Sequence, residues 1–444
     1  MKKSKICIIS LVLLCSILLG SILLRGDSAV AAPKKEYFSY NESQMSVTMK
    51  KGEAVLSFLE DSAIVYLSLP QFSNYEVGEK IHLEFQLELD GKKDRYDNMH
   101  LYTWGQTLID YGFEKGVPNL VSFDACLFEK NGKKVISLEF GEVLGKDVYL
   151  YDFKVNDDVF STEGLFGGIE MWQFEPNNPD NTMMMGYVFA TPEKQLVIFD
   201  GGLHEDGREL MKLINQYGRE VDGWFLSHLD GDHIYAVTEI IEKYDIVIHN
   251  LYYNFTADWT TIPENSKDNV RKLEAAIAAH PEKVLNVHTP GKGDSYTFGS
   301  LTVKSLNDPD YETLVNTANN TTVVYKLETP GESLLMLGDL GESGEKFIQD
   351  PEFVKEIRDC RVVQMAHHGQ NGVSDKFYSL IDDIKVCLYP APYWLYDVVK
   401  DAQGGLEAGH GLGTGPWKTL HTRSLMRSMG VRYSYPADDR VYIK

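Results

Sequence analysis

The sequence predicts an α+β protein with two domains: an all-β sandwich over residues 36–158, and a domain of two sheets between helical layers over 166–444. The 444 residues exceed the usual size of a single domain. In the first part, apolar and polar residues alternate and no helical period of useful length occurs. In the second part, strand-like apolar runs alternate with helical segments, as expected for sheets covered by helices.

The first 32 residues have the pattern of an export signal. Lysines at positions 2, 3 and 5 precede the apolar segment 6–24, and an A-x-A cleavage pattern stands at 29–31. The apolar segment is also long enough to span a bilayer, so an uncleaved membrane anchor is the alternative. Both interpretations place the rest of the chain outside the cytoplasm, because the lysines favour the cytoplasmic side. We therefore expect a secreted or extracellular protein that contacts a membrane only through this segment.

The charge of the chain bears on its partners. The formal net charge is -22, and loss of residues 1–32 would remove mainly basic side chains. Nucleic acids and anionic lipids would be repelled at long range. A bound metal pair could reverse the sign locally. The charge therefore disfavours nucleic acid as a partner and favours a small-molecule or envelope-polymer substrate, while the oligomeric state is left open.

Three stretches define the predicted sandwich. Residues 81–89 alternate apolar and polar side chains, as a half-buried strand should, and 148–155 do so again. Asn131-Gly132 indicates a hairpin turn between strands at 125–129 and 135–140. We predict an antiparallel sandwich from this pattern.

The predicted sandwich resembles the jelly-roll carbohydrate-binding modules of secreted bacterial enzymes. Tyr96, Tyr102 and Trp104 would then offer a stacking platform for sugars. Core or cross-strand packing is the alternative for these aromatic side chains. Such sandwiches serve many purposes, so a role in carbohydrate binding stays a hypothesis.

The second domain is predicted from a series of short apolar runs. The expected strands are 184–190, 196–199, 224–226, 246–248, 301–303, 322–327, 334–337, 362–365 and 386–389, and the expected helices are 209–217 and 234–243. Loop 159–168 carries Ser, Thr and three glycines and is the expected junction between the domains.

A polar cluster follows the apolar run at 224–226. His228, Asp230, Asp232 and His233 place four potential metal ligands within six positions, between a strand and a helix. Short turns at the carboxyl end of a strand can aim imidazoles and carboxylates at one point, as a dinuclear site requires. The alternative is a solvated acidic turn with two incidental histidines.

Two further apolar runs end in candidate ligands. The run at 334–337 leads to Gly338-Asp339, and the run at 362–365 leads to His367-His368-Gly369. Adjacent side chains do not easily face the same ion, so one histidine should bind metal and the other should contact substrate. The sequence leaves open which histidine does which. A helix N-cap for Asp339 and a core histidine pair are the structural alternatives.

Together these motifs resemble those of the metallo-β-lactamase superfamily, with Asp230 where the signature His-x-His-x-Asp-His has its second histidine. The Asp variant is similar to the metallo-β-lactamase-like domain of bacterial competence DNA-uptake channels. The resemblance covers about residue 171 to the end of the chain. It implies an αββα sandwich with a dinuclear metal site at one edge, and hence a metal-dependent hydrolase.

The resemblance also implies roles for single residues. The expected metal ligands are His228, Asp230, Asp232, His233, Asp339, His367 and His368. Asp339 would bridge the two ions, and Asp200 would orient the metal-binding loop without binding metal. The histidine that the superfamily places before the Gly-Asp strand is absent from 319–324, so Asn320 or water would complete the first ion's shell.

Candidate catalytic residues complete the predicted site. They are Asp232, His367, His368 and His421. His421 resembles the family's final histidine and would contact a phosphoryl oxygen, with a helix-capping or surface role as the alternative. The Gly-rich stretch 407–417 before it would cover the metal edge.

The predicted ligands mix nitrogen and oxygen atoms, which suits two divalent ions, Zn²⁺ or Mn²⁺. Such ions would activate a water and stabilise charge on an attacked phosphoryl or acyl centre. Superfamily phosphoesterases use a bridging Asp, so a phosphodiesterase acting on a cell-envelope or extracellular substrate is favoured. The alternatives are an extracellular nuclease of the competence-channel type and a non-catalytic surface binding protein with a degenerate metal fold.

Overall fold

The computed structural model describes residues 28–29, 32–90, 95–96, 100–103, 106–109, 113–116, 118–156, 160–180, 182–396, 418–437 and 441–444. The chain divides into two compact units, Met1–Phe160 and Ser161–Lys444. Residues 1–27 of the predicted leader and the Gly-rich stretch 407–417 lie outside the described residues. Among the helices that are described, none combines the length and the apolar character needed to cross a membrane.

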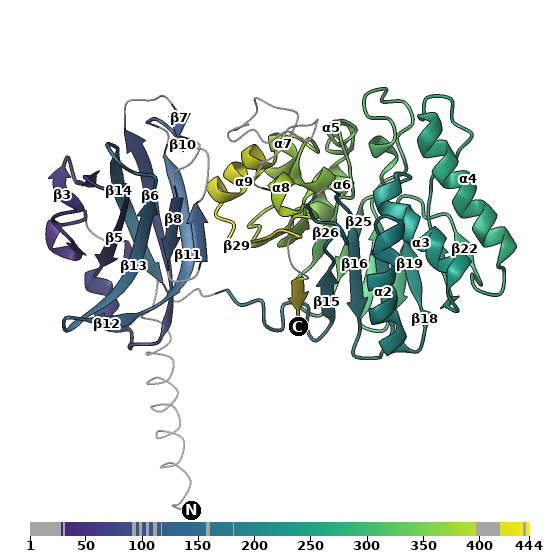
Figure 1. The fold of residues 1–444 in the computed structure, drawn as a ribbon, viewed down its shortest axis with the longest axis horizontal. Coiled ribbons are helices and arrows are strands. Elements are labelled where there is room, and N and C mark those ends of the chain that lie inside the picture. Colours follow the sequence, from purple (N-terminus) through teal and green to yellow (C-terminus); the bar gives the residue numbers. More distant parts are fainter. Residues whose placement is uncertain are drawn as a thin grey trace, which may run out of the picture. The chain divides into compact units, whose positions relative to one another are not determined.

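The first unit consists of antiparallel sheets (Figure 1). One sheet has the order β11 (Asn119–Cys126), β6 (Lys80–Asp90), β14 (Asp147–Asn156), β4 (Glu53–Phe58) and β3 (Met45–Lys50), with β1 (Ser28–Ala29) beside β14. The other has the order β2 (Phe38–Tyr40), β5 (Ser62–Leu67), β13 (Lys133–Gly141), β8 (His100–Thr103) and β9 (Gln106–Ile109), with β12 (Phe128–Lys130) beside β13. Strand β7 (Arg95–Tyr96) pairs with β10 (Phe113–Glu114).

These sheets bury one common apolar core, so the predicted all-β sandwich is confirmed. Phe58 of β4 and Phe140 of β13 face each other across it with ring centroids 5.3 Å apart. The predicted strand 81–89 is confirmed as β6, and 148–155 as β14. Inward residues of β6 are fully buried at alternate positions, which is why its sequence alternates.

The predicted hairpin turn is also confirmed. Lys130 pairs with Lys133, and both turn residues, Asn131 and Gly132, have positive φ, as a two-residue turn between twisted strands requires. The prediction of one strand over 125–129 was wrong, because two strands, β11 and β12, share these residues. Ala125 belongs to β11, which pairs with β6, while β12 belongs to the sheet of β13. Trp104 and the side chain of Tyr96 lie outside the described residues, so the stacking platform stays a hypothesis.

The second unit contains two seven-stranded sheets. The first has the order β22 (Val287–His288), β21 (Leu251–Tyr252), β19 (Gly223–Phe225), β17 (Leu196–Asp200), β16 (Gly186–Ala190), β15 (Glu170–Gln173) and β30 (Val441–Ile443). The second has the order β23 (Ser295–Phe298), β24 (Leu301–Ser305), β25 (Tyr325–Glu328), β26 (Leu334–Met336), β27 (Val362–Gln364), β28 (Val386–Leu388) and β29 (Tyr433–Tyr435). A short parallel pair joins β18 (Glu220–Val221) and β20 (Val247–Ile248).

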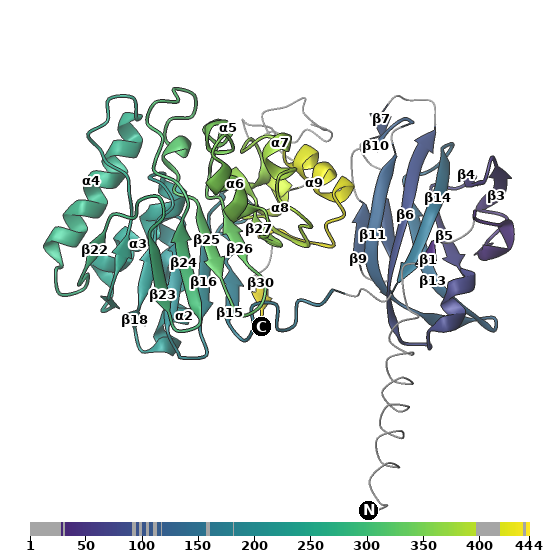
Figure 2. The ribbon, with the colours of Figure 1, turned by 180° about the vertical axis from the view of Figure 1, so that it is seen from behind.

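The two sheets pack face to face and are covered by helices on the outside (Figures 1 and 2). Tyr325 of β25 contacts Phe199 of β17 and Phe225 of β19, with ring centroids 5.7 and 5.3 Å apart. The first sheet packs against α2 (Gly207–Ile214), α3 (Gly231–Lys243) and α4 (Glu264–Ala279). The second packs against α5 (Gly344–Phe347), α6 (Pro351–Ile357), α7 (Asp375–Tyr378), α8 (Tyr393–Tyr396) and α9 (Thr419–Ser428). The predicted αββα architecture is therefore confirmed.

Burial on both faces explains the sequence of the central strands. All five residues of β16 and of β17 are buried, and apart from Asp200 at the end of β17 their sequences show no polar alternation. Several predicted boundaries were wrong, and the helix expected at 209–217 is α2, which spans Gly207–Ile214. Helix α3 begins at Gly231 and not at 234, and β25 begins at Tyr325 and not at 322. Short 3₁₀ turns also occur at Lys35–Tyr37, Pro70–Asn74, His204–Asp206, Asn215–Tyr217, Asn319–Thr321 and Ala366–Gly369.

Candidate metal centre

Three strands of the second unit deliver the predicted ligands to one place. His228 follows β19, Asp339 follows β26, and the pair His367-His368 follows β27. The early start of α3 places Asp232 and His233 in its first turn. A carboxylate there is favoured by the positive end of the helix dipole. The sequence therefore predicted the ends of the strands correctly, but placed these two residues in a turn that is in fact helical.

Two turns of unusual backbone shape close the site. A Cβ on Gly338, whose φ is +51°, would lie 2.9 Å from the Cβ of Ser227, so only glycine fits there. His367 and His368 also have positive φ, 51° and 59°, which non-glycine residues rarely adopt. Strained backbone of this kind is concentrated at functional sites.

Gln364, at the end of β27, holds these two turns together. Its carbonyl oxygen accepts hydrogen bonds from the backbone N–H groups of Leu337 and Gly338, each at 2.7 Å. Its amide nitrogen donates to the carbonyl of Met365 at 2.7 Å. The prediction missed this residue. The available signal was a lone polar side chain at the end of an otherwise apolar strand, now fully buried.

Four side chains form the densest group of potential ligands among the described residues. One ligand atom from each of Asp232, His233, Asp339 and His368 lies within 4.8 Å of all the others. Nε2 of His368 is 3.1 Å from a carboxylate oxygen of Asp232 and 3.6 Å from one of Asp339. Nε2 of His233 is 3.3 Å from the other oxygen of Asp339.

A second group shares Asp339 with the first. Nε2 of His228 lies 3.7 Å from a carboxylate oxygen of Asp230 and 3.8 Å from one of Asp339. Asp230 also accepts a hydrogen bond from the hydroxyl of Ser266 at 2.8 Å. Nε2 of His367, which is one-fifth exposed, lies 3.8 Å from Asp339. The Asp339 carboxylate is thus the point where both groups meet.

The outer partners of the histidines decide which ring nitrogen faces the centre. Nδ1 of His368 donates to the carbonyl of Pro390 at 2.6 Å, because a carbonyl oxygen can only accept. Nδ1 of His233 donates to Asp200 at 2.9 Å. Asp200 also accepts from the N–H and the hydroxyl of Ser227, each at 2.7 Å. The Nε2 atoms of both histidines are therefore directed at the carboxylates, in the arrangement that metal-binding histidines adopt.

These residues fit a metal centre. Nε2 of His228, Nε2 of His233 and one oxygen of Asp339 are buried without a hydrogen-bond partner. Buried polar atoms are normally paired, so atoms left open toward a common point indicate a ligand. The set mixes imidazole nitrogens and carboxylate oxygens, which suits divalent ions such as Zn²⁺ or Mn²⁺.

The mutual influence of the groups is visible in their pKa values. Burial opposes ionisation of Asp232, but His233 and His368 outweigh it and lower the pKa of this carboxyl to about 2. Burial would likewise raise the pKa of Asp339, yet the surrounding histidines, first His233, hold it well below its usual range. Burial would lower the pKa of His233, but nearby carboxylates, led by that of Asp339, raise it well above its usual range. The centre therefore keeps its carboxylates ionised and ready to bind cations.

The comparisons with known proteins agree with this geometry. Residues 186–382 match the family model described as the metallo-beta-lactamase superfamily. The second unit has the metallo-β-lactamase fold. It is a metallo-β-lactamase-fold hydrolase domain with a candidate metal cluster. No curated protein sequence is detectably similar to the chain.

Among the solved structures that are similar to the chain are three with low sequence identity to it. The metallo-beta-lactamase fold protein YhfI from Bacillus subtilis is 11% identical, with a TM-score of 0.38 over 62% of this chain and 99% of that chain. A diphosphatase from the PhnP family is 10% identical, with a TM-score of 0.33 over 61% and 86% of the two chains. Zn²⁺-bound PqqB from Methylobacterium extorquens is 11% identical, with a TM-score of 0.33 over 59% and 87%.

Two predicted residues of the metallo-β-lactamase domain have partners away from the cluster. Asn320 is fully buried, and its amide oxygen accepts from the N–H of Ser343 at 3.0 Å while its amide nitrogen donates to the carbonyl of Val315. It therefore links the segment before β25 to the residue that precedes α5. His421 on α9 pairs with Asp375 at 2.8 Å and is exposed. In the described part of the chain, no contact joins His421 to the cluster.

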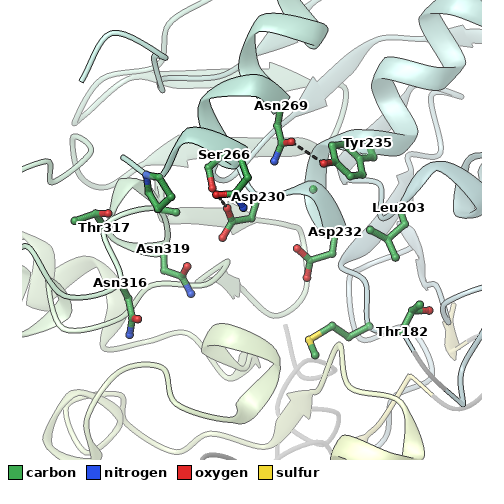
Figure 3. Close-up of a pocket in the computed structure, with 15 residues that line it drawn as sticks. Thr182, Leu203, Asp230, Asp232, Tyr235, Ser266, Asn269, Asn316, Thr317 and Asn319 are labelled. Atoms are coloured by element: carbon green, nitrogen blue, oxygen red, sulfur yellow. Dashed lines mark hydrogen bonds between the residues drawn. The ribbon is translucent and has the colours of Figure 1, made fainter. Parts of the chain in front are cut away.

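A groove opens beside the metal centre of the metallo-β-lactamase domain. It has a volume of about 610 Å³. Asp230 and Asp232 lie along it, and their carboxylates point into the same space (Figure 3). The start of α4 and the loop around 316–319 form its other walls. A substrate in this groove would reach both candidate metal positions.

Proposed function

We propose that this protein is an exported dinuclear-metal hydrolase that cleaves phosphodiesters in a cell-envelope or extracellular substrate. The observation that carries the proposal is the position of Asp339. Its two carboxylate oxygens lie 3.3–3.8 Å from the Nε2 atoms of the four histidines His228, His233, His367 and His368. A carboxylate placed in this way would be able to supply one oxygen to each of two ions.

The proposal assigns the ligands to two positions. Asp232, His233, Asp339 and His368 would hold one ion, and His228, Asp230 and Asp339 would hold the other. When bound, such ions lower the pKa of a water molecule and neutralise charge that develops on an attacked phosphoryl group. The chain keeps its ligands oriented through Asp200, which fixes the ring of His233, and through the carbonyl of Pro390, which fixes His368.

His367 is proposed to face the substrate, and His368 to bind metal. The ring of His368 is fully buried, whereas that of His367 is one-fifth exposed. Nδ1 of His367 donates to the carbonyl of Asn371 at 3.1 Å, and Nε2 lies 3.2 Å from the amide nitrogen of Gln370. The variant His368→Ala should lose bound metal. His367→Ala should keep its metal and lose turnover, because the proposal assigns this ring to the substrate and not to either ion.

The export proposal rests on the sequence of the first 32 residues. Production in a bacterial host followed by mass spectrometry of the secreted chain would test it. A mature chain that begins at or near Pro33 supports cleavage after the A-x-A pattern. Retention of the protein in the cytoplasm with an intact amino terminus would refute export.

Phosphodiesterase activity is the direct test of the proposed function. The protein would be stripped of metal, reloaded with Zn²⁺ or Mn²⁺, and given bis(p-nitrophenyl) phosphate, with Asp232→Asn as the control. Metal-dependent turnover that the control lacks would support the hydrolase. Absence of turnover with either ion, together with less than one bound ion per chain, would favour a non-catalytic binding protein. Faster cleavage of DNA than of envelope polymers would favour the nuclease.

A further inference from the structure

Three asparagines line the groove beside the metal centre; Asn265 and Asn316 are exposed, and Asn319 is buried. Asn265 lies in the first turn of α4, and Asn316 and Asn319 lie on the facing loop. Within the described residues, none of these three side chains makes a hydrogen bond, although other polar groups of the lining do. Asn269, for example, accepts from Tyr235 and donates to the carbonyl of Leu229. In Figure 3, Asn319 lies between Asn316 and the carboxylate of Asp230, on the side of the groove that faces Asp232.

Beyond the metal ligands, the described lining of the groove offers no cation to a highly anionic occupant. Asp230 and Asp232 are the only charged side chains among the described residues that line it. Of the nearby basic residues of α4, Lys267 pairs with Glu264, Arg271 pairs with Glu264 and Asp268, and the ammonium of Lys272 lies over the ring of Tyr235. A nucleic acid would place further phosphates along the groove, and each would need a cation that the lining does not supply.

The groove also lacks a free aromatic platform for a nucleobase. Tyr235 is the one aromatic residue among the described lining residues. His204 stacks on its ring at a centroid distance of 4.4 Å, and the ammonium of Lys272 lies over it at 6.0 Å. Bases of single-stranded nucleic acids are normally held by stacking on such rings.

We propose that this groove binds an uncharged, hydroxyl-rich group of the substrate, such as a sugar or polyol, next to the scissile phosphodiester. This inference rests on the proposed function, because the phosphoryl group would sit at the metal centre. An asparagine amide offers both donors and an acceptor, and a hydroxyl group is itself both donor and acceptor. A phosphate oxygen only accepts hydrogen bonds, so it would use the amide N–H donors of Asn265, Asn316 and Asn319 but not their carbonyl acceptors. The three amides are therefore specificity-determining residues for a glycosyl or polyol phosphodiester.

Calorimetric titration of the metal-loaded protein tests the inference without relying on turnover. The probes are inorganic phosphate, glucose 1-phosphate and thymidine 5′-monophosphate. Glucose 1-phosphate should bind roughly tenfold more tightly than phosphate, which is what two added hydrogen bonds contribute. The double variant Asn265→Ala/Asn319→Ala should remove this preference and leave the affinity for phosphate unchanged.

Two further variants guard against structural artefacts. Asn316 has a φ of +48°, so Asn316→Gly removes its amide without straining the backbone. Asn286→Ala is the matched control, because this asparagine is exposed and lies outside the groove lining. The glycine variant should weaken the binding of glucose 1-phosphate and leave that of phosphate unchanged. The control should bind all three probes with the affinities of the unmodified protein.

The outcomes separate the inference from the proposed function. Binding of phosphate without any preference for glucose 1-phosphate would overturn the inference and leave the metal-dependent phosphodiesterase standing. Tighter binding of thymidine 5′-monophosphate would overturn it as well and favour a nucleotide substrate. Failure of all three probes to bind the metal-loaded protein would contradict the proposed function, and the inference with it.

Discussion

Each unit of the chain buries a histidine among carboxylates, and the two clusters differ in whether their polar atoms find partners within the protein. In the sandwich, Nδ1 of His82 lies 2.8 Å from Asp124, and Nε2 lies 3.3 Å from Glu84 and 3.2 Å from the hydroxyl of Ser122. Glu84 is paired in turn with Lys154. The ring nitrogens and carboxylates of this cluster are thus paired within the sandwich, and we call it the closed cluster.

The cluster of the second unit, which we call the open cluster, is not fully paired within the protein. Buried atoms of His228, His233 and Asp339 have no hydrogen-bond partner, and all three point toward the same centre. Composition alone would not separate the two clusters, because both combine buried imidazole with carboxylates. The difference teaches that unpaired ligand atoms, more than the presence of histidine and aspartate, distinguish a metal centre from a structural polar network.

The largest expected effect is that of Asp339→Asn. The amide has one oxygen, so it cannot give an oxygen to each of two ions, and the bound metal should fall to one ion or less per chain. Turnover should fall by roughly three orders of magnitude, since a metal ion contributes several kcal/mol to transition-state stabilisation. Elemental analysis and the phosphodiesterase assay measure both effects. Unchanged metal content would show that Asp339 does not bridge the ions.

His82→Leu should break the closed cluster and spare the open one. It leaves the carboxylate of Asp124, which is almost fully buried, without its histidine. Loss of one partner of a buried pair typically costs about 3 kcal/mol or more, so the unfolding transition of the sandwich should shift to lower denaturant concentration. Metal content should not change. Loss of metal in this variant would mean that metal binding in the second unit depends on the folding of the sandwich.

Asp200→Asn should weaken metal binding without abolishing it. The substitution preserves size but removes the charge that faces Nδ1 of His233. Outer partners of this kind contribute about 10- to 100-fold to metal affinity. A metal titration should therefore show weaker binding, and excess metal should restore most of the turnover. If turnover stays low at saturating metal, Asp200 has a role beyond orienting the histidine.

The smallest effect is expected from the pH dependence of the sandwich. His82 beside Glu84, helped by Lys154 and opposed by burial, lowers the pKa of Glu84 from 4.5 to about 2. Above pH 4.5 the contribution of Glu84 to stability is complete, and it is lost as the pH falls from 4.5 toward 2, because the unfolded chain takes up the proton first. The loss should be on the order of 1–3 kcal/mol.

Denaturant unfolding of the sandwich between pH 2 and 6 measures this slope. Glu84→Gln, which cannot ionise, is the control and should show a smaller dependence on pH over the same window. Equal slopes in both proteins would assign the dependence to other carboxylates.

Much of the fold was predictable because local apolar patterns decide local structure. The run at 196–199 is buried on both faces as β17, and 81–89 is half-buried as β6, each as its pattern indicated. Boundaries failed where tertiary contacts override the pattern. Helix α3 begins at Gly231, where the apolar period had not yet started. In the run at 322–327 the strand begins only at Tyr325, and Val323 before it donates its N–H to the carbonyl of Ser227 in the metal-binding loop.

The sequence by itself determined where the candidate ligands stand, since each follows an apolar run that must end at the edge of a sheet. Only the tertiary structure decided which side chains of the site meet: Asp200 with His233, and Asp232 with His368. It revealed the hydrogen bond from the N–H of Gly338 to Gln364, a residue that the prediction missed. It also brought Asn265 to the same groove as Asn316 and Asn319. The physical reason is that burial patterns act over a few neighbouring residues, whereas contacts between side chains depend on how strands distant in the chain pair and how helices pack on them.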